Sequence, residues 1–472
     1  MMRAGVSTVI TGRVLVAGAG VSGTGCARLL TDLGVDTTIA DDNAEALTKA
    51  VAATGGRATG MTVAEARDHL MLFDKVVTSP GWRPDSPLLV DAAFAHREVL
   101  GDVELAYRLD RAGVFGEPRT WLVVTGTNGK TTTTAMLAAM MAESGRETGL
   151  RAEPVGNIGV AVADALVDPV RVDVLVAELS SFQLHWSNQL TPDVGVLLNL
   201  ADDHIDWHGS FAGYAAAKAK VLTGPVAVAG VDDERVLIEA RRINPRHLIG
   251  FTLNEPRPGQ FGVVDGRLID HAGDEPVDLG PVEGIQPPGP AGILDALAAA
   301  AVARARGVRP AAIETALRGF QVAGHRGATV LRADGVDWID NSKATNPHAA
   351  DAALTGLDSV IWIAGGQLKG ADIRSLIAAH AHRLKAVELL GVDRQIIADA
   401  VADLAPGVPV HLTDSTDPAA AMADLVTHAA STAVPGDTVL LAPAAASLDM
   451  YTGMAQRGDL FTEAAHRISQ EA

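Results

Sequence analysis

The segment Val123–Thr134 constrains the fold of this chain more than any other part of its sequence. Trp121 and Leu122 lead into it as β-formers, and the Ala- and Met-rich stretch Thr134–Ala142 that follows it favours a helix. A glycine-rich loop lies between the two. Strand, glycine-rich loop and helix in this order are typical of a phosphate-binding loop, because backbone N–H groups and the helix N-terminus surround an anion there. The sequence therefore predicts an α/β fold built around a polyphosphate site.

The residue types of the loop match this chemistry. Gly126 and Gly129 let backbone N–H groups approach a polyphosphate, Lys130 can reach its terminal phosphates, and the Thr131 hydroxyl can ligate Mg²⁺. The generic motif has another glycine where this chain has Val124, so the match is to a shortened variant. The alternative is an ordinary strand–turn–helix that contains Gly-Lys-Thr, but the order of the elements favours an ATP site. The expected ATP-binding residues are Gly126, Thr127, Asn128, Gly129, Lys130, Thr131 and Thr132.

Length and charge limit the class of protein. At 472 residues the chain is too long for one hydrophobic core and predicts about three domains. The net charge of −19 argues against nucleic acid or an anionic membrane as the main partner. The single cysteine, Cys26, indicates a reducing compartment, and Met1–Gly12 has no signal-peptide pattern. The most apolar helix candidate, Ile293–Ala303, is interrupted by Asp295 and is too short to span a bilayer. We expect a soluble cytoplasmic protein.

Apolar strands alternate with helices through three blocks of the chain, which predicts largely parallel sheets covered on both faces. Glycine and proline interrupt the pattern around Gly113–Pro118, and a third block begins near Ala323. We predict the α/β class with three domains. These are an N-terminal Rossmann-like domain (1–117), a central P-loop ATP-binding α/β domain (118–322) and a C-terminal Rossmann-like α/β domain (323–472).

The first block opens with a second glycine-rich turn, Gly18–Gly23, and Asp41 ends the next strand. This spacing fits a dinucleotide fingerprint, although the same geometry binds any diphosphate and a packing turn remains possible. Because an ATP loop follows downstream, we favour a nucleoside diphosphate portion of the substrate over NAD. Asp41 would then meet a ribose or base edge, or cap a helix.

Acidic and histidine-containing clusters follow two strands of the central block. Glu178 ends the strand Val174–Ala177, where a carboxylate beside a phosphate loop commonly holds Mg²⁺. The alternative is a solvated Glu178 next to a serine helix cap. The dense cluster Asn199–His208 suggests a second divalent site, and the helix after it contains Lys218, whose usual fate is a solvated helix face.

Polar residues also follow strands in the third block. Arg326 and Lys343 could neutralise phosphate charge in a transition state, and Lys369 could pair with a substrate carboxylate. Ser447 lies at the end of the last strand. Each of these positions also fits a helix cap or a turn. Their recurrence at strand ends favours a site, since ligands bind at that edge of open α/β sheets.

Four of these segments together resemble the Mur ligase family, and the resemblance covers essentially the whole chain. They are Gly126–Thr132, Glu178–Gln183, Asp203–Asp206 and Ser342–Asn346. The first is shared across the wider family, including folylpolyglutamate synthases. The second and fourth are particular to family members that add D-glutamate.

The resemblance implies an ATP-dependent amide ligase that adds D-glutamate to UDP-N-acetylmuramoyl-L-alanine through an acyl phosphate, in cytoplasmic peptidoglycan precursor synthesis. It also implies a monomer that binds neither nucleic acid nor membrane. The implied UDP-substrate residues are Val21, Ser22, Asp42, Asn43, Gly81 and Asn157. The implied D-glutamate residues are Thr345, Lys369 and Ser447. Two Mg²⁺ ions would be held by Thr131, Glu178, His204 and a carbamylated Lys218. The catalytic residues would be Lys130, His204, Arg326 and Lys343, with Arg326 and Asn341 also contacting ATP.

The chain departs from the family pattern at three places. The adenine-binding His-Asn-x-x-Asn segment corresponds to Ala291–Asp295, which includes Gly292. Asn341 stands where an aspartate usually precedes Ser-Lys, and Met454 stands where an aromatic residue is expected near D-glutamate. The adenine contacts and one wall of the amino-acid pocket therefore stay open.

Other functions stay open at this point. Another Mur-type or a folylpolyglutamate-type ligase would share the ATP loop, but the latter would not need the Gly18–Gly23 turn. An NAD-dependent dehydrogenase would leave the ATP loop unexplained. An ATP-binding regulator without activity is disfavoured because Lys130, Glu178, His204 and Lys343 are all present.

Overall fold

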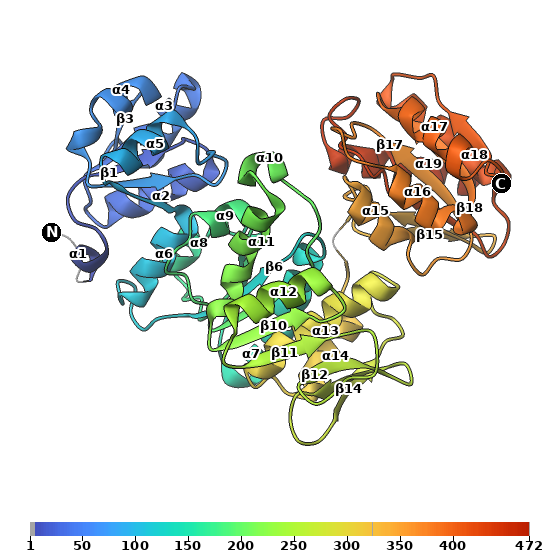
Figure 1. The fold of residues 1–472 in the computed structure, drawn as a ribbon, viewed down its shortest axis with the longest axis horizontal. Helices are drawn as coiled ribbons and strands as arrows, with labels where there is room; N and C mark the ends of the chain where they lie inside the picture. Colours follow the sequence, from blue (N-terminus) through green and yellow to red (C-terminus); the bar gives the residue numbers. More distant parts are fainter. Residues whose placement is uncertain (1–4, 323, 472) are drawn as a thin grey trace. The chain divides into compact units, whose positions relative to one another are not determined.

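The computed structural model describes residues 5–322 and 324–471, and three sheets follow one another along the chain (Figure 1). The chain forms two compact units. The first contains the chain up to Pro281 together with Leu297–Leu317, and the second contains Val282–Ala296 and the chain from Arg318 onward. The α/β class with three predominantly parallel sheets confirms the predicted fold class. The domain boundaries at 117/118 and 322/323 stay predictions.

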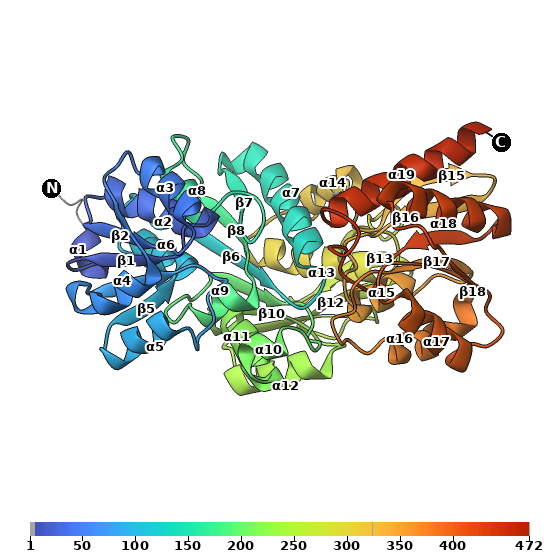
Figure 2. The same ribbon diagram turned by 90° about the horizontal axis from the view of Figure 1, so that it is seen from above.

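The N-terminal sheet is five-stranded and parallel, with strand order β3-β2-β1-β4-β5. Its strands are β1 (Val14–Ala17), β2 (Thr37–Ala40), β3 (Thr59–Met61), β4 (Lys75–Thr78) and β5 (Glu98–Gly101). Its helices are α1 (Val6–Val9), α2 (Val21–Asp32), α3 (Ala44–Ala53), α4 (Val63–Asp68), the 3₁₀ turn η1 (Leu70–Leu72), α5 (Pro87–Phe94) and α6 (Asp102–Arg111). Val14 and Val16 face a core shared with α2 and α3, whereas Leu15 and Ala17 face α4 and α5. Figure 2 shows these helices on opposite sides of the sheet, as a doubly wound fold requires.

The central sheet has nine strands in the order β14-β13-β12-β11-β10-β9-β6-β8-β7. Its strands are β6 (Thr120–Thr125), β7 (Ala152–Gly156), β8 (Val174–Glu178), β9 (Val194–Leu197), β10 (Val226–Gly230), β11 (Leu248–Phe251), β12 (Gln260–Val264), β13 (Arg267–His271) and β14 (Val277–Pro281). Its helical elements are α7 (Lys130–Thr148), α8 (Val162–Val167), α9 (Ser181–His185), α10 (Ile205–His208), α11 (Phe211–Ala219), η2 (Lys220–Thr223), α12 (Glu234–Ile243), α13 (Pro290–Ala305) and α14 (Pro310–Gly319). Pairing is parallel across the strands from β7 to β12 in the sheet order, and β12–β14 form antiparallel hairpins.

The C-terminal sheet has six strands in the order β15-β16-β20-β17-β18-β19, and only the β15–β16 pair is antiparallel among its described pairings. Its strands are β15 (Ala328–Ala333), β16 (Val336–Asp340), β17 (Val360–Gly365), β18 (Leu384–Leu390), β19 (Val410–Leu412) and β20 (Thr438–Leu441). Its helical elements are α15 (Pro347–Leu354), α16 (Arg374–His380), η3 (Ala381–Arg383), α17 (Arg394–Leu404), α18 (Pro418–Thr432) and α19 (Met454–Glu471). One face packs against α15, α16 and α17, and the other against α18 and α19.

Helix α6 contributes side chains to two cores. Leu105 and Leu109 pack with the N-terminal sheet, while Val103, Ala106 and Tyr107 pack with the central sheet. Since side chains three and four residues apart share a helix face, opposite faces of one helix serve the two sheets. The N-terminal and central sheets are therefore joined through α6 as well as through the chain itself.

Within residues 5–322 and 324–471, none of the helices combines the length and the apolar character needed to traverse a lipid bilayer.

Candidate active site

The glycine-rich loop of the central sheet has the predicted order of elements. β6 ends at Thr125, and α7 begins at Lys130 after Gly129, which has a left-handed φ of 81°. A Cβ at Gly126 would lie 2.8 Å from the Cβ of Leu198, so a larger side chain would displace the loop from β9. Both glycines are thus required by the loop geometry.

Two lysine ammonium groups converge on the carbonyl of Gly126. The Nζ of Lys130 donates to the carbonyl oxygens of Gly126 at 2.9 Å and Thr127 at 2.7 Å. The Nζ of Lys218 donates to the same Gly126 oxygen at 2.6 Å and lies 3.3 Å from the Thr125 hydroxyl. Lys218 is only 2% exposed, which excludes the alternative of a solvated helix face.

The environment of Lys218 disfavours its charged form. Burial is the main cause that lowers its pKa well below the ordinary value, and the positive charge of Lys130 lowers it further. The carboxylates of Asp203 and Glu178 oppose this shift only in part. A buried lysine next to another cation favours the neutral amine, which is the nucleophilic form.

Glu178 ends β8 beside the loop and has one unused oxygen. Its side chain is buried, and its Oε1 accepts a hydrogen bond of 2.7 Å from Nδ2 of Asn157. Its Oε2 is also buried and has no hydrogen-bond partner among the described residues. Ser180 does cap α9, in a capping box with Gln183, but the alternative of a solvated Glu178 is wrong. An unpaired buried carboxylate oxygen is the kind of group that a cation satisfies.

The expected metal ligands do not form a complete protein cage. Within the ranges that the structure describes, no group of three or more His, Cys, Asp and Glu side chains has the geometry to hold a metal. Thr131 lies in the first turn of α7, next to Lys130. This donor set fits Mg²⁺, which commonly binds through one or two carboxylates and takes its other ligands from phosphate oxygens and water.

His204 lies on the rim of an aromatic cluster. Its backbone is left-handed, with φ of 52°, its side chain is about half exposed, and its ring centroid is 4.6 Å from that of Phe182. His208, one turn further on, contacts Phe182 and Trp207 and has a buried Nε2. Burial, with the charge of His185, lowers the pKa of His208 to about 4. His208 is thus a neutral packing residue, while His204 is accessible.

Asn199, Tyr214 and Thr127 hold the loop against the central sheet. The Asn199 side chain accepts from the N–H of Asn128 at 2.8 Å and donates to its carbonyl oxygen at 3.1 Å. The Tyr214 hydroxyl lies 2.8 Å from the Thr127 hydroxyl. Asn199, beyond the end of β9, and Tyr214, on α11, thus hold the loop by hydrogen bonds. The sequence did not predict this role for either residue. The one available signal was the position of Asn199 immediately after a strand.

A cavity of about 610 Å³ lies at the N-terminus of α2, and Val21 and Asn43 are among the residues that line it. Asn43 is the N-cap of α3, and its Oδ1 accepts from the N–H of Ala46 at 3.0 Å. Asp42 accepts from the N–H of Val63 at 2.9 Å. Neither Ser22, Asp42 nor Gly81 belongs to the residues lining this cavity.

Asp41 contacts the backbone of the first glycine-rich turn. Its Oδ2 accepts from the N–H of Ala19 at 2.7 Å, and its Oδ1 accepts from the N–H of Asn43 at 2.8 Å. Both oxygens therefore have backbone partners, and Asp41 fixes the turn.

Backbone hydrogen bonds join the three C-terminal loops that contain Thr345, Lys369 and Ser447. The N–H of Ala444 donates to the carbonyl of Ala344 at 2.9 Å. Gln367 and Ala446 exchange two bonds, of 2.8 and 2.9 Å. Ser447 is buried, and Lys369 has a left-handed φ of 54°. The predicted D-glutamate residues thus belong to adjoining loops.

A buried arginine that the sequence did not single out links the same loops. Arg457 on α19 is fully buried and donates to Ser342 Oγ at 3.0 Å, to the carbonyls of Ser342 and Gly365 at 2.9 and 3.3 Å, and to Ala445 O at 3.2 Å. Burial lowers its pKa to about 10. Its planar set of donors therefore connects loops after β16, β17 and β20.

His325 is held next to this region by a buried carboxylate. Its Nδ1 lies 2.6 Å from Oδ2 of Asp340, whose Oδ1 accepts from the N–H of Ser342 at 2.9 Å. Burial raises the pKa of Asp340, and the hydrogen bond from His325 opposes this effect. The N–H of Lys343 donates to the His325 carbonyl at 3.0 Å, so the backbone at Lys343 is joined to the residue that precedes Arg326.

The positions that depart from the family pattern have structural contacts. Asn341 donates its N–H to the carbonyl of Leu441 at 2.8 Å, and the carbonyl of Met454 accepts from the Ser342 hydroxyl at 2.7 Å. Ala291–Asp295 lies in α13, and Asp295 is buried. No adenine contact follows from these observations.

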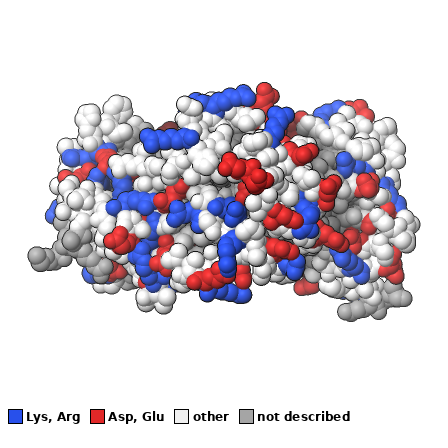
Figure 3. All heavy atoms as spheres, turned by 90° about the horizontal axis from the view of Figure 1, so that it is seen from below, with Lys and Arg blue, Asp and Glu red and all other residues white. Residues whose placement is uncertain are grey.

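Acidic and basic side chains both occur on the face drawn in Figure 3.

Three family models match the chain. The Mur ligase middle domain matches residues 124–264, and the Mur ligase, glutamate ligase domain matches residues 325–445. The alanine dehydrogenase/PNT C-terminal domain matches residues 1–94.

Similar proteins cover nearly the whole chain. A UDP-N-acetylmuramoylalanine–D-glutamate ligase from Corynebacterium efficiens is 60% identical over 96% of this chain and 94% of its own length. The enzyme of the same name from Mycolicibacterium smegmatis is 48% identical over 96% of each chain. Among solved structures, a UDP-N-acetylmuramate–alanine ligase from Thermotoga maritima has a TM-score of 0.55 at 17% identity, covering 98% of this chain and 100% of its own.

Proposed function

Because the chain belongs to the Mur ligase family, we propose that it is an ATP-dependent ligase that adds D-glutamate to UDP-N-acetylmuramoyl-L-alanine. It is an acid–amino-acid ligase of peptidoglycan synthesis and uses ATP and Mg²⁺. The observation that supports this most directly is the convergence of Lys130 and Lys218 on the glycine-rich loop, next to the buried Glu178. The reaction belongs to the cytoplasm, and we expect a monomer.

The UDP portion of the substrate is proposed to bind the N-terminal sheet. The cavity beside α2 offers Val21 as an exposed apolar surface and Asn43 as a polar contact. Ser22, Asp42 and Gly81 are proposed to contact the same portion from the neighbouring strand ends. Asn157, which already orients Glu178, is proposed to contact the muramoyl-alanine end.

Two Mg²⁺ ions are proposed beside the ATP loop. Thr131 and Glu178 would hold one ion, and the unused Oε2 of Glu178 supports this assignment. His204 and Lys218 would serve the other, with Lys218 as a carbamate. Carbamylation joins the neutral amine to CO₂ with loss of a proton, and the lowered pKa of Lys218 supplies that neutral amine. When bound, the ions neutralise charge on the phosphates.

The first chemical step activates a carboxylate, because direct acylation by a carboxylate would require oxide as the leaving group. An oxygen of the terminal alanine carboxylate attacks the γ-phosphorus of ATP, the bond to the β-phosphate oxygen breaks, and ADP leaves. Lys130 binds the β- and γ-phosphates, and its carbonyl contacts hold it over the loop before ATP arrives. ATP contacts by the loop from Gly126 to Thr132, Arg326 and Asn341 complete the proposed site.

The second step forms the amide. The amino group of D-glutamate attacks the acyl phosphate, a tetrahedral intermediate forms, and phosphate leaves while the amine loses a proton. Lys343, Arg326 and His204 are proposed to stabilise the negative charge of this step. Thr345, Lys369 and Ser447 are proposed to bind D-glutamate, where Lys369 provides the cation for a carboxylate.

The test is ADP release by the purified chain with UDP-N-acetylmuramoyl-L-alanine and Mg²⁺. D-glutamate, L-glutamate and no amino acid are compared side by side, and Lys130→Ala serves as the inactive control. Of these three conditions, we expect turnover only in the one that contains D-glutamate. Turnover with a folate substrate and L-glutamate instead would favour the folylpolyglutamate alternative, and near-normal turnover by Lys130→Ala would refute the ATP-site assignment.

A further inference from the structure

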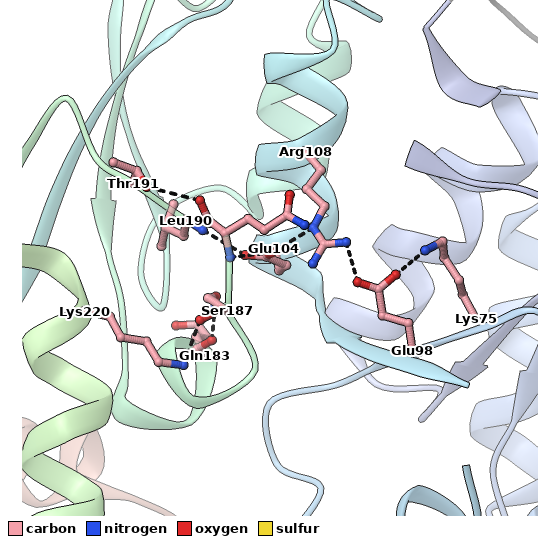
Figure 4. A network of polar contacts seen from close by, with 10 residues as sticks. Lys75, Glu98, Glu104, Arg108, Gln183, Ser187, Leu190, Thr191 and Lys220 are labelled. Carbon is pink, nitrogen blue, oxygen red and sulfur yellow. Dashed lines mark hydrogen bonds and ion pairs between the residues drawn. The ribbon is translucent and has the colours of Figure 1, made fainter. Parts of the chain in front are cut away.

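A network of buried and partly buried polar contacts lies between the N-terminal and central sheets (Figure 4). It begins on the N-terminal sheet, where Lys75 of β4 pairs with Glu98 of β5. The other oxygen of Glu98 accepts from Arg108 of α6 at 2.6 Å, and Arg108 also donates to Glu104 at 2.7 Å. Glu104 is fully buried, which is rare for a glutamate that is not part of a defined site.

Both carboxylate oxygens of Glu104 accept hydrogen bonds from the central domain. Its Oε1 accepts from the N–H of Gln189 at 2.8 Å, and its Oε2 accepts from the N–H of Leu190 at 3.1 Å. Two backbone donors and the Arg108 guanidinium thus satisfy the buried charge. Removing such an acceptor would leave two buried N–H groups without partners.

The contact with Glu104 is one of a regular series along α6. The N–H of Gly101, at the helix start, donates to the carbonyl of Trp186 at 3.0 Å. The Tyr107 hydroxyl donates to the carbonyl of Thr191 at 3.1 Å, and Arg111 donates to Asp193 at 2.7 Å. Residues 101, 104, 107 or 108, and 111 share one helix face. One face of α6 therefore holds the segment 186–193, which we call the α9–β9 segment.

The α9–β9 segment follows α9 directly along the chain. On its other side, the Nζ of Lys220 donates to the carbonyls of Leu184, His185 and Ser187 at 2.8, 3.0 and 2.8 Å. The chain from the end of α9 to Leu190 is therefore bonded to Glu104 of α6 on one side and to Lys220, directly after α11, on the other.

Through α9 this arrangement reaches the proposed metal and substrate ligands. α9 starts with the capping box of Ser180 and Gln183, two residues after Glu178. Asn157, proposed to meet the muramoyl-alanine end, donates to Glu178. We propose that Glu104 is a positioning residue of the ligase reaction, which sets the α9–β9 segment and Glu178 relative to the sheet that binds the UDP portion of the substrate. This inference rests on the proposed function.

The experiment compares Glu104→Gln with the matched control Glu98→Gln, which breaks the outer contact to Lys75 and Arg108 but leaves the α9–β9 segment bonded. In Glu104→Gln an amide NH₂ would face an N–H donor. We expect kcat to fall about tenfold and KM for the UDP substrate to rise about tenfold, because small misplacements of substrate are costly. KM for D-glutamate should change less than twofold, since its proposed residues lie on the C-terminal unit. Glu98→Gln should leave all constants within about twofold.

A purely structural role would lower the thermal midpoint of Glu104→Gln while leaving its kinetic constants, measured well below that midpoint, within twofold of wild type. That result would overturn the proposal. If wild type itself shows no D-glutamate-dependent ADP release, the proposed function fails instead.

A measurement on the wild-type chain guards against a variant that does not fold. Hydrogen–deuterium exchange of the amides of Gln189 and Leu190 is followed with and without UDP-N-acetylmuramoyl-L-alanine. We expect slower exchange of both amides with the substrate bound, because binding to the N-terminal sheet and beside Glu178 stabilises the segment between them. Unchanged exchange under saturating substrate would contradict the coupling.

Discussion

At the scale of single residues, Lys218 combines two features that rarely occur together, full burial and a cationic neighbour. The ammonium group has lost its water, and Lys130 lies close enough to lower its pKa further. Keeping such a residue charged is costly, so its neutral amine is favoured. A carbamate at this position would place a negative charge beside Lys130 and so create an attraction.

We predict that Lys218→Ala lowers the rate of ADP release by at least about a hundredfold, because the anion proposed for the metal site would be lost. Short carboxylates such as acetate or formate should restore part of the rate by occupying the vacated space. Arg146→Ala, which removes a cation that is 75% exposed near the C-terminal end of α7, is the control and should be unaffected. Full activity of Lys218→Ala without additive would show that Lys218 has no metal role.

The residues that could be predicted from the sequence differ from those that could not in their position relative to strand ends. Lys130 and Glu178 lie next to glycine or directly at strand ends, so their position along the chain predicts their position at the sheet edge. Glu104 and Arg457 lie inside helices, and their partners include backbone groups far away in sequence. Nothing local distinguishes a buried charged residue from a solvated one, so these two could not be predicted.

At the scale of elements, α19 packs tightly against His325 and Asp340 at Gly458. A Cβ at this position would lie 2.0 Å from Nδ1 of His325 and 2.6 Å from Oδ2 of Asp340. We predict that Gly458→Ala lowers the free energy of unfolding of this unit by about 1–3 kcal/mol, as expected for overpacking. Calorimetry of the full chain measures this. Gly453→Ala has nothing within 4 Å of the new Cβ and is the control. Equal stability of both variants would contradict the prediction.

Short apolar runs with β-branched residues, such as Thr37–Ala40 and Thr438–Leu441, are distinctive of strands. α6 and α18 are among the elements that were not predicted. α6 has two apolar faces with charged residues between them, because it packs against two sheets. Its pattern therefore lacks the single apolar stripe by which amphipathic helices are recognised.

At the scale of the whole molecule, both units contain carboxylates that are stabilised in their charged form. For Glu98 and Asp437 burial raises the pKa, but hydrogen bonds from Lys75 and Arg108 to Glu98, and from Lys385 to Asp437, outweigh it, so that each pKa lies below its ordinary value. A lowered folded-state pKa stabilises the fold above the unfolded-state value, and this stability is lost as the pH falls.

We therefore predict that the thermal midpoint of the chain falls as the pH is lowered from about 6 towards about 3.5, through the ordinary range of carboxyl pKa values. Burial raises the pKa of Asp340 and Glu388, and these two groups oppose the trend. The check is a series of melting curves. Asp437→Asn should be less stable than wild type at pH 6 and show a shallower decline in acid. A midpoint that rises towards pH 3.5 would mean that the raised carboxyls dominate.

Because α6 packs against two sheets, it has a consequence for engineering this chain. Its Leu105 and Leu109 belong to one interior and its Val103, Ala106 and Tyr107 to another, so a cut at residue 117 leaves apolar surface exposed on both fragments. A graft of the first 117 residues from a distant homologue would need compatible counterparts for Gln189 and Leu190 in the recipient. The N-terminal domain is therefore not freely interchangeable, even though its sheet is complete in itself.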